Sequence, residues 1–437
     1  MTWKKLKRNN NYSINENGHL TLGGVDTVEL AHQYGTPLMV MDENAIRTQC
    51  RLYKSAMTRY FGGASTIHYA SKALSCKAIY RIMKDEGVGV DLVSLGEMYT
   101  AKAAGFDLSR ACLHGNNKTD AEIAKAISAG IGEFMVDSFE ELESLDRIAG
   151  EQGVKQRIML RLTPNIDAHT QKAIATGQLD SKFGTPIATG QAERLVKLAL
   201  TKENLVLEGF HSHIGSLIFE YEPYIQQAQV MFEFMADIKA KTGYTAQKIN
   251  LGGGFAVRYT ADQPQVDIEA NICKIAAEVD KICASYGLDR PAILMEPGRS
   301  IVAAAGVTLY TVGTVKEIEG YRTYVSVDGG MTDNPRYALY QSRYEVLLAN
   351  RAAEKKDLIC TVAGRCCESG DLIGEGMALQ TPQRGDTLAV LVTGAYNYSM
   401  ASNYNRVPRP AMVFVKDGED RLVIRRETYE DLYRNDL

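Results

Sequence analysis

The segment "STIHYASKALSCKAIYRIMKDEG", residues 65–87, joins a short β-branched and aromatic run to an amphipathic helical pattern, and Lys72 lies where the two meet. The first run favours a strand and the second a helix. A strand followed by a helix is the repeating unit of a parallel sheet with helical crossovers. Whether Lys72 is an ordinary solvated lysine at a strand tip or a functional one depends on the rest of the chain.

The same alternation of short β-type runs and longer helical runs continues to about residue 303. The predicted strands lie at 65–72, 87–94, 111–115, 132–138, 156–164, 205–216, 248–255 and 291–300. The segments between them, such as 94–105 and 270–287, have helical patterns, and several end on glycine as helices commonly do. Eight such alternations predict a (β/α)8 barrel over residues 45–303.

The chain changes character from about residue 304, where strand-like runs follow one another with few helical periods. This pattern predicts a C-terminal antiparallel β-domain formed by residues 304–437, to which residues 1–44 could add a strand. A chain of 437 residues is long enough for these two domains. Because no low-complexity linker separates them, we expect the domains to pack tightly.

The composition excludes several classes of partner. A net charge of -4 gives no general attraction to nucleic acid or to an anionic membrane. The basic N-terminus lacks an apolar segment behind it and no later run would span a bilayer, so we expect a cytoplasmic protein. The eight cysteines show no zinc-type spacing and are expected to be free thiols.

Several residues that could carry chemistry fall at the ends of the predicted barrel strands. In such a barrel the active site forms at the carboxyl ends of the strands, so these residues are expected to share one mouth. They are Lys72, Asp91, His114, Arg161, His213, Gly252 to Gly254, and Glu296 to Arg299.

Two glycine-bearing motifs, "LGGGF" at 251–255 and "EPGRS" at 296–300, lie at the ends of the predicted seventh and eighth strands, and barrels often bind phosphate in the loops after these strands. A tight turn would also explain three glycines, but two motifs at these positions indicate a phosphorylated ligand. A lysine facing that site suggests pyridoxal 5'-phosphate held as a Schiff base, since this bond needs a primary amine. Glu296 could keep the cofactor's ring nitrogen protonated or could pair with a neighbouring lysine or arginine, and spacing leaves both open.

The motif "HSHIGS" contains His211 and His213, which we expect on the same face of one strand. No HExxH motif or carboxylate cluster accompanies them, so the sequence predicts no metal site. His213 could instead stack on a planar cofactor ring, and Ser216 could reach its phosphate.

The predicted β-domain carries two polar features. Cys367 precedes Glu368 in a glycine-flanked loop, where a thiol could donate a proton, whereas most of the cysteines are expected to be buried and structural. Residues 394–413 are dense in Tyr, Asn and Arg, which suits a polar binding surface.

An ordered set of motifs covers nearly the whole chain. It comprises "YASKA", "VDLVSLGE", "SKFG", "HSHIGS", "LGGGF", "EPGRS", "DGGMTDNPRYALY", "CESGD" and "GAYNYSMASNYNRVPRPA". Together they resemble the fold-type III pyridoxal-phosphate decarboxylases, and most closely the members that act on meso-2,6-diaminopimelate. The resemblance implies a TIM-like barrel of the alanine racemase type, a C-terminal β-domain, and a homodimer with shared active sites. One departure is "RYALY", where Tyr337 replaces a proline found in many relatives.

The resemblance also implies residue roles. Lys72 would be the Schiff-base lysine, and Cys367, reaching in from the partner subunit, would protonate the intermediate. Cofactor-binding roles fall on Lys72, Asp91, His213, Ser216, Gly252, Gly253, Gly254, Glu296, Gly298, Arg299 and Tyr396. Substrate-binding roles fall on Arg299, Arg336, Tyr340, Glu368 and Tyr396.

The implied reaction converts meso-2,6-diaminopimelate to L-lysine and carbon dioxide, the last step of bacterial-type lysine biosynthesis. The substrate's distal carboxylate suits Arg299 and Arg336, while Glu368 could meet its ammonium. Ornithine, lysine or carboxynorspermidine decarboxylation on the same fold is an alternative. A racemase is less favoured, because the alanine racemases place an arginine at the ring nitrogen. A non-catalytic relative that binds pyridoxal phosphate could lack Lys72 or Cys367, and both are present.

Overall fold

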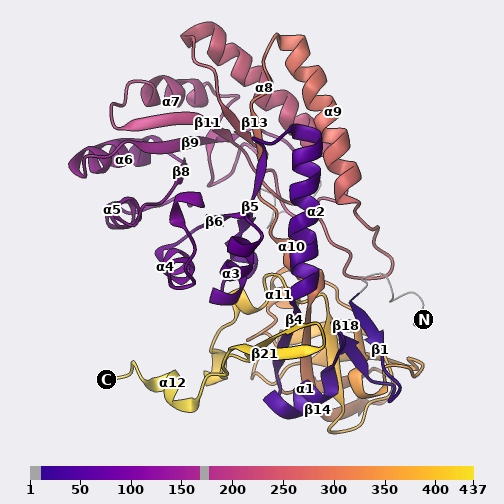
Figure 1. Ribbon diagram of the computed structural model, residues 1–437. Helices are drawn as coiled ribbons and strands as arrows, with labels where there is room; N and C mark the ends of the chain where they lie inside the picture. Colours follow the sequence, from indigo (N-terminus) through magenta and orange to yellow (C-terminus); the bar gives the residue numbers. More distant parts are fainter. Residues whose placement is uncertain (1–10, 168–176) are drawn as a thin grey trace. The chain divides into compact units, whose positions relative to one another are not determined.

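The computed structural model describes residues 11–167 and 177–437 (Figure 1). These residues form two compact units. The barrel unit comprises Gln49–Ala256 and Gln265–Gly298. The β-unit comprises the described residues up to Thr48, together with Val257–Pro264 and Arg299–Leu437.

The barrel unit is built on a closed ring of parallel strands. Its strands are β5 (Thr66–Ala70), β6 (Gly89–Leu92), β7 (Ala111–Leu113), β8 (Glu133–Val136), β9 (Gln156–Thr163), β11 (Leu205–His211), β12 (Lys248–Asn250) and β13 (Ala292–Met295). Successive strands pair in parallel and β13 returns to β5, while the short β10 (Thr185–Pro186) pairs with β9. The predicted (β/α)8 barrel is therefore confirmed.

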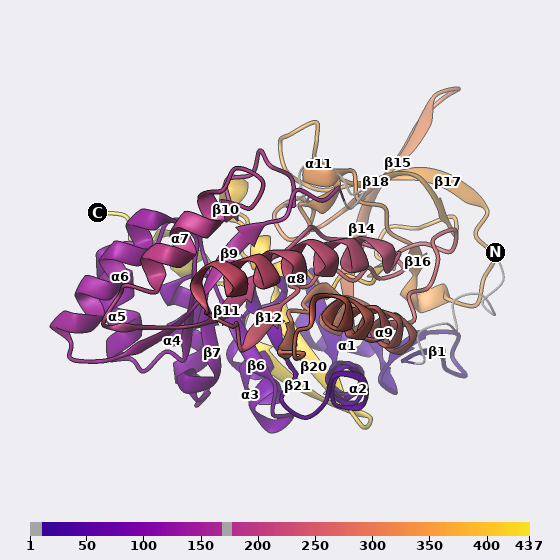
Figure 2. The ribbon, with the colours of Figure 1, turned by 90° about the horizontal axis from the view of Figure 1, so that it is seen from above.

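Helices cover the outside of this ring. They are α2 (Glu43–Phe61), α3 (Lys77–Asp85), α4 (Leu95–Ala103), α5 (Asp120–Ser128), α6 (Phe139–Glu151), α7 (Gln191–Ala199), α8 (Glu222–Thr242) and α9 (Ile268–Tyr286). In Figure 1, α3 to α6 follow one another around the strands, and Figure 2 shows α8 beside α9. Several of these helices begin at a side-chain cap. At the start of α5, Thr119 and Glu122 form a capping box that satisfies free backbone N–H groups.

The β-unit contains a mostly antiparallel sheet, as predicted. Its main path runs β18, β17, β15, β14, β4, β20 and β21, while β16 pairs with β19, and β19 pairs with β14. The pairs β15 with β17 and β4 with β20 are parallel. The bounds are β4 (Leu38–Asp42), β14 (Gly306–Ile318), β15 (Arg322–Val327), β16 (Val346–Leu348), β17 (Leu358–Ala363), β18 (Leu372–Leu379), β19 (Thr387–Leu391), β20 (Ala411–Lys416) and β21 (Glu419–Ile424).

Smaller elements complete the β-unit. They are a three-stranded sheet of β1 (Tyr12–Ile14), β2 (Leu20–Leu22) and β3 (Val25–Asp26), with helices α1 (Thr27–Tyr34), α10 (Arg299–Val302), α11 (Arg336–Tyr340) and α12 (Tyr429–Tyr433). The N-terminal segment does supply a strand to the main sheet, because β4 lies between β14 and β20.

One strand is shorter than its sequence pattern suggested. β11 ends at His211, so His213 lies in the loop beyond it. The prediction that both histidines share a face of one strand is wrong. Since Gly215 has a φ of +147°, the backbone here follows a loop conformation and no longer alternates as a strand does.

Two further observations concern the cysteines and the helices. All eight cysteines are free thiols, and five of them are buried. Within residues 11–167 and 177–437, no helix combines the length and apolar character needed to cross a membrane.

Gly253 is required by a close backbone approach in the barrel unit. A Cβ on this residue would lie 2.0 Å from the backbone oxygen of Glu296. We expect Gly253→Ala to lower the free energy of unfolding by about 3 kcal/mol, because backbone atoms must shift to relieve the overlap. Gly63→Ala is the matched control, since a Cβ there meets nothing within 4 Å. Chemical denaturation should show a change within about 0.5 kcal/mol for the control, and equal stability of the two variants would contradict the geometry.

Candidate active site

The carboxyl ends of the barrel strands bring several predicted site residues together. Lys72 lies in a 3-10 turn, Ser71–Ala73, directly after β5, and its side chain is exposed. Asp91 lies in β6, and Glu296 follows β13. Ala70 donates its backbone N–H to the carbonyl of Pro297 at 3.2 Å, which holds the end of β5 against the loop after β13.

Glu296 is buried and surrounded by hydrogen-bond donors. Its Oε1 accepts from Asn250 Nδ2 at 2.6 Å, and its Oε2 lies 3.0 Å from Nε2 of His211. Nε2 of His114 lies 3.1 Å from Oε1. Burial alone would raise the pKa of this carboxyl, but the two imidazoles outweigh it and hold the pKa well below its usual value. Glu296 is therefore ionised, and histidines rather than a lysine or arginine are its partners.

His114 also faces Asp91, with Nε2 of the imidazole 3.6 Å from Oδ1 of the carboxylate. Burial raises the pKa of Asp91 to about 6. The atoms of His114, His211 and Glu296 that could bind a metal lie within 4.8 Å of one another, close enough to coordinate one metal ion. Because Asn250 and both imidazoles already engage Glu296, we interpret this group as a network that positions the carboxylate.

The loops after β11 and β12 meet at a set of glycines. Gly252 and Gly254 have φ angles of +68° and +111°, which side-chain-bearing residues rarely adopt. A Cβ on Gly254 would lie 2.4 Å from the carbonyl oxygen of Gly215, so the "HSHIGS" and "LGGGF" loops are in contact. Ser216, which follows Gly215, therefore lies next to the glycine-rich loop.

His213 is held over this loop as a neutral ring. Its Nδ1 accepts the backbone N–H of Gly253 at 3.3 Å. Burial, followed by the nearby charge of Lys72, lowers the pKa of His213 well below its usual value. A neutral imidazole carries no charge that would oppose stacking on a flat aromatic ring.

The barrel residues fit pyridoxal phosphate. The exposed Lys72 supplies a primary amine, and the ionised Glu296 supplies an acceptor for a ring N–H. In the part of the chain that the structure describes, buried Oδ1 of Asp91 faces His114 at 3.6 Å but makes no hydrogen bond, so it can still accept one from a ligand. The close approach of the loops at Gly254 leaves no room for side chains beside the expected phosphate site.

In the β-unit, one tyrosine joins two of the predicted substrate-binding arginines. Tyr259 Oη accepts from Nη1 of Arg299 at 2.7 Å and from Nη1 of Arg336 at 3.0 Å. Burial raises the pKa of Tyr259, but the two guanidinium charges prevail and lower it. Arg336 also donates to the hydroxyl of Tyr344 at 2.8 Å. The sequence reasoning missed both tyrosines, because each lies in a loop without a recognisable motif.

Tyr396 lies against the same group. The guanidinium carbon of Arg299 lies 4.7 Å from the centre of the Tyr396 ring. Tyr396 has a φ of +61°, a left-handed conformation that costs a residue with a side chain about 1–3 kcal/mol. Such strain is retained where the surrounding structure fixes a residue in place. Tyr340, at the end of α11, is half-buried in the same unit.

The vicinal cysteines have different environments in the loop between β17 and β18. The backbone N–H of Cys366 donates to Asp371 Oδ2 at 2.7 Å, and that of Cys367 donates to Asn405 Oδ1 at 2.8 Å. Cys367 is exposed, whereas Cys366 is half-buried and burial raises its thiol pKa to about 11. Glu368 is exposed beside Cys367. The backbone of the loop is fixed by these hydrogen bonds, while Cys367 is exposed.

A closed barrel with a strand-end lysine, an ionised carboxylate and contacting glycine loops defines the class of pyridoxal-phosphate-dependent barrel proteins. A family model described as "Pyridoxal-dependent decarboxylase, pyridoxal binding domain" matches residues 43–303. Diaminopimelate decarboxylase of Bacillus subtilis is 46% identical over 97% of this chain and 96% of its own length. The chain belongs to the pyridoxal-dependent decarboxylases and, within them, to the diaminopimelate decarboxylase family.

Other relatives agree with this assignment. Diaminopimelate decarboxylase of Halalkalibacterium halodurans is 47% identical, covering 97% of this chain and 96% of the relative. The crystal structure of diaminopimelate decarboxylase from M. jannaschii in co-complex with L-lysine matches with a TM-score of 0.90, 34% identity and 98% coverage of both chains. The protein is thus a decarboxylase whose cofactor is pyridoxal phosphate.

Proposed function

We propose that this protein decarboxylates meso-2,6-diaminopimelate to L-lysine and carbon dioxide, the last step of lysine biosynthesis. The observation that carries the substrate assignment is the pair of buried arginines, Arg299 and Arg336, held on Tyr259. A guanidinium can clasp a carboxylate with two parallel hydrogen bonds. Diaminopimelate has a distal carboxylate that such a site would bind, whereas ornithine and lysine have none.

The barrel residues would hold the cofactor. Pyridoxal phosphate, when bound, supplies an electron sink for the charge left after carbon dioxide departs. Lys72 provides the amine that carries the cofactor, and His213 provides a neutral ring to stack on it. Glu296 accepts the ring N–H, with His114, His211 and Asn250 holding its carboxylate ionised and oriented. Phosphate and further cofactor contacts are assigned to Asp91, Ser216, Gly252, Gly253, Gly254, Gly298, Arg299 and Tyr396.

The proton donor is assigned to Cys367, acting in a homodimer whose subunits share their active sites. Its exposure in the single chain and the fixed backbone of its loop support this assignment. In this arrangement Cys367 returns a proton to the α-carbon of the substrate. The same proposal divides the chain into a cofactor-binding barrel domain, residues 45–303, and a β-domain, residues 1–44 and 304–437, which completes the active site across the dimer. Free thiols throughout the chain are consistent with the reducing cytoplasm.

The remaining substrate contacts are assigned to Arg336, Tyr340, Glu368 and Tyr396. The distal end of diaminopimelate carries an ammonium as well as a carboxylate, so its pocket needs an acidic group beside the arginines. Glu368 supplies this charge and is exposed next to Cys367. Cys367 and Glu368, the first two residues of the "CESGD" motif, would then enter the site together.

A comparison of kcat/KM tests the substrate assignment directly. Pyridoxal-phosphate-loaded protein is assayed with meso-diaminopimelate, L-ornithine and L-lysine at matched concentrations. We expect meso-diaminopimelate to be preferred by about 10⁴-fold, because ornithine and lysine have no distal carboxylate to bind the two arginines. A preference for ornithine or lysine would overturn the assignment while leaving the fold and cofactor unchanged.

Tyr259→Phe should raise KM for diaminopimelate by about tenfold, with a smaller change in kcat. The reason is that Arg299 and Arg336 lose their common hydrogen-bond acceptor, which positions them to bind substrate. The residues proposed to act at the reacting carbon are unchanged. Tyr321→Phe is the control, since Tyr321 is 90% exposed in the same unit. Steady-state kinetics on both variants provides the measurement, and an unchanged KM in Tyr259→Phe would show that Tyr259 does not position the arginines.

A further inference from the structure

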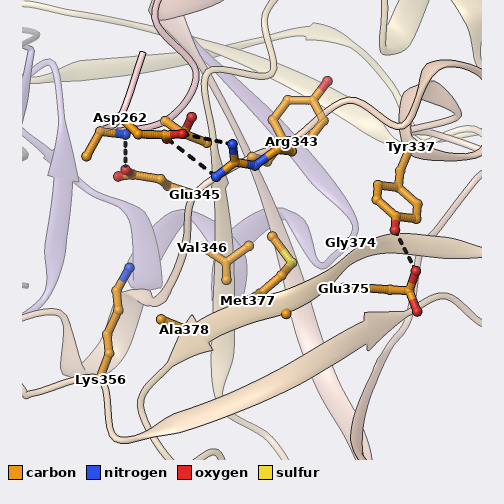
Figure 3. A pocket seen from close by; sticks show the side chains of 14 residues that line it. Asp262, Tyr337, Arg343, Glu345, Val346, Lys356, Gly374, Glu375, Met377 and Ala378 are labelled. Carbon is orange, nitrogen blue, oxygen red and sulfur yellow. Dashed lines mark hydrogen bonds and ion pairs between the residues drawn. The ribbon is translucent and has the colours of Figure 1, made fainter.

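A cavity lies within the β-unit. It has a volume of about 470 Å³, within the range of small-molecule sites. Its walls come from residues 260–262, from 343–346 and from β18, with Tyr337 of α11 at one end (Figure 3). None of the residue roles proposed above falls on its charged lining residues.

Lys356 is the most distinctive residue of this cavity. Its ammonium makes no hydrogen bond or ion pair with any residue in the described ranges of the chain. Figure 3 shows its side chain extending from the edge of the cavity toward Glu345. Burial lowers the pKa of Lys356, and the charge of Glu345 counteracts this. A half-buried ammonium without a partner loses part of its solvation, so the cavity is suited to an anionic group beside it.

Glu345 adds an opposite charge at the same end. Its Oε1 accepts the backbone N–H of Ala261 at 2.7 Å, which fixes the carboxylate in place. Its Oε2 has no partner among the residues that the structure describes. The other charges here are already paired, since Arg343 donates to Asp262 at 2.8 Å. The Lys356 ammonium and the free Oε2 of Glu345 therefore complement a ligand that carries both a carboxylate and an ammonium.

The walls beyond this end are apolar. Val346, Met377 and Ala378 line the middle of the cavity (Figure 3). At the far end the hydroxyl of Tyr337 donates to Oε2 of Glu375 at 2.7 Å, and Arg322 neutralises Glu375 at 2.6 Å. The far end therefore offers no unpaired charge, which favours an uncharged aliphatic side chain over a basic or acidic one.

We propose that this cavity binds an α-amino acid with an unbranched aliphatic side chain. Its carboxylate pairs with Lys356, its ammonium pairs with Glu345, and its side chain lies along Val346 and Met377. Tyr344 also lines the cavity and holds Arg336 through the 2.8 Å hydrogen bond. Occupancy of the cavity can therefore shift Arg336 and change KM for diaminopimelate, a consequence that rests on the proposed function.

Calorimetric titration of the cofactor-loaded protein with L-norleucine and with hexanoate tests the binding. Hexanoate has the same carbon chain and carboxylate but lacks the ammonium. We expect Lys356→Met to weaken both probes at least tenfold, and Glu345→Gln to weaken only L-norleucine. The matched control is Lys355→Met, because Lys355 is exposed next to Lys356 and lies outside the cavity. It should bind both probes as the unaltered protein does.

The proposal would be overturned if L-norleucine did not bind the unaltered protein at a concentration on the order of 10 mM, which is near the weakest useful affinities. It would also be overturned if Lys356→Met bound L-norleucine as tightly as the unaltered protein does. Thermal melts of each variant confirm that it is folded. The binding test does not depend on the reaction. If L-norleucine binds but leaves KM unchanged in a working decarboxylase, the link through Tyr344 is wrong and the site stands. If no decarboxylation occurs at all, the proposed function fails separately.

Discussion

Lys72→Ala is expected to lose all detectable decarboxylation. Only a primary amine can carry pyridoxal phosphate covalently, and Lys72 is the lysine at the barrel mouth beside Glu296 and the glycine loops. Because the Lys72 side chain is exposed, its removal should cost little stability. Carbon dioxide release measures the first effect, and the visible absorbance of the bound cofactor measures its attachment.

Lys77→Ala is the control for this variant. Lys77 is exposed at the start of α3, five residues along the chain, and takes no part in the proposed site. Its activity and absorbance should match those of the unaltered protein. Full turnover by Lys72→Ala would show that another lysine carries the cofactor, and the site would have to be rebuilt around it.

Cys367→Ala is expected to lower kcat by about 10²- to 10⁴-fold, the usual contribution of a positioned proton donor. Cofactor absorbance should persist, because the cofactor-binding residues lie elsewhere in the chain. Cys366→Ala is the matched control and should change kcat little, since Cys366 is half-buried and its thiol pKa is raised. The opposite result for the two cysteines would assign the donor to Cys366.

Mixing subunits tests whether Cys367 acts across a dimer. Lys72→Ala and Cys367→Ala protein are unfolded and refolded together in equal amounts. Half of the resulting dimers then carry one intact site, so about a quarter of the original activity should return. No recovery in a mixture shown to contain mixed dimers would mean that Lys72 and Cys367 act in the same subunit.

The barrel could be predicted from the sequence because its signal is local and repeated. Each strand is a short apolar run bounded by polar or glycine residues. The helices have their own periodicity, and some have side-chain caps, such as the Thr119 and Glu122 box of α5. The position of a strand's end was less certain. β11 ends before His213, and the loop that follows contains Gly215, which lies against Gly254, a residue remote in sequence.

The candidate site could be predicted only where its residues stand at strand ends or in recognisable motifs. Lys72 and Glu296 meet that condition, but the partners of Glu296 do not. His211 was considered only as part of a metal pair, and Asn250 had no assigned role. Tyr259 and Lys356 lie in irregular segments, and their roles come from neighbours brought close by the tertiary structure. No local pattern records such contacts.

The most direct test of the account is the product made from meso-2,6-diaminopimelate by the cofactor-loaded protein. We expect one carbon dioxide and one L-lysine for each substrate consumed, and no turnover of the L,L isomer. Consumption of the meso compound without carbon dioxide would indicate racemisation, and carbon dioxide from ornithine alone would indicate a different amino-acid decarboxylase. The first result would contradict the assignment of Cys367 to the proton that completes L-lysine, and the second would contradict the assignment of Arg299 and Arg336 to a distal carboxylate.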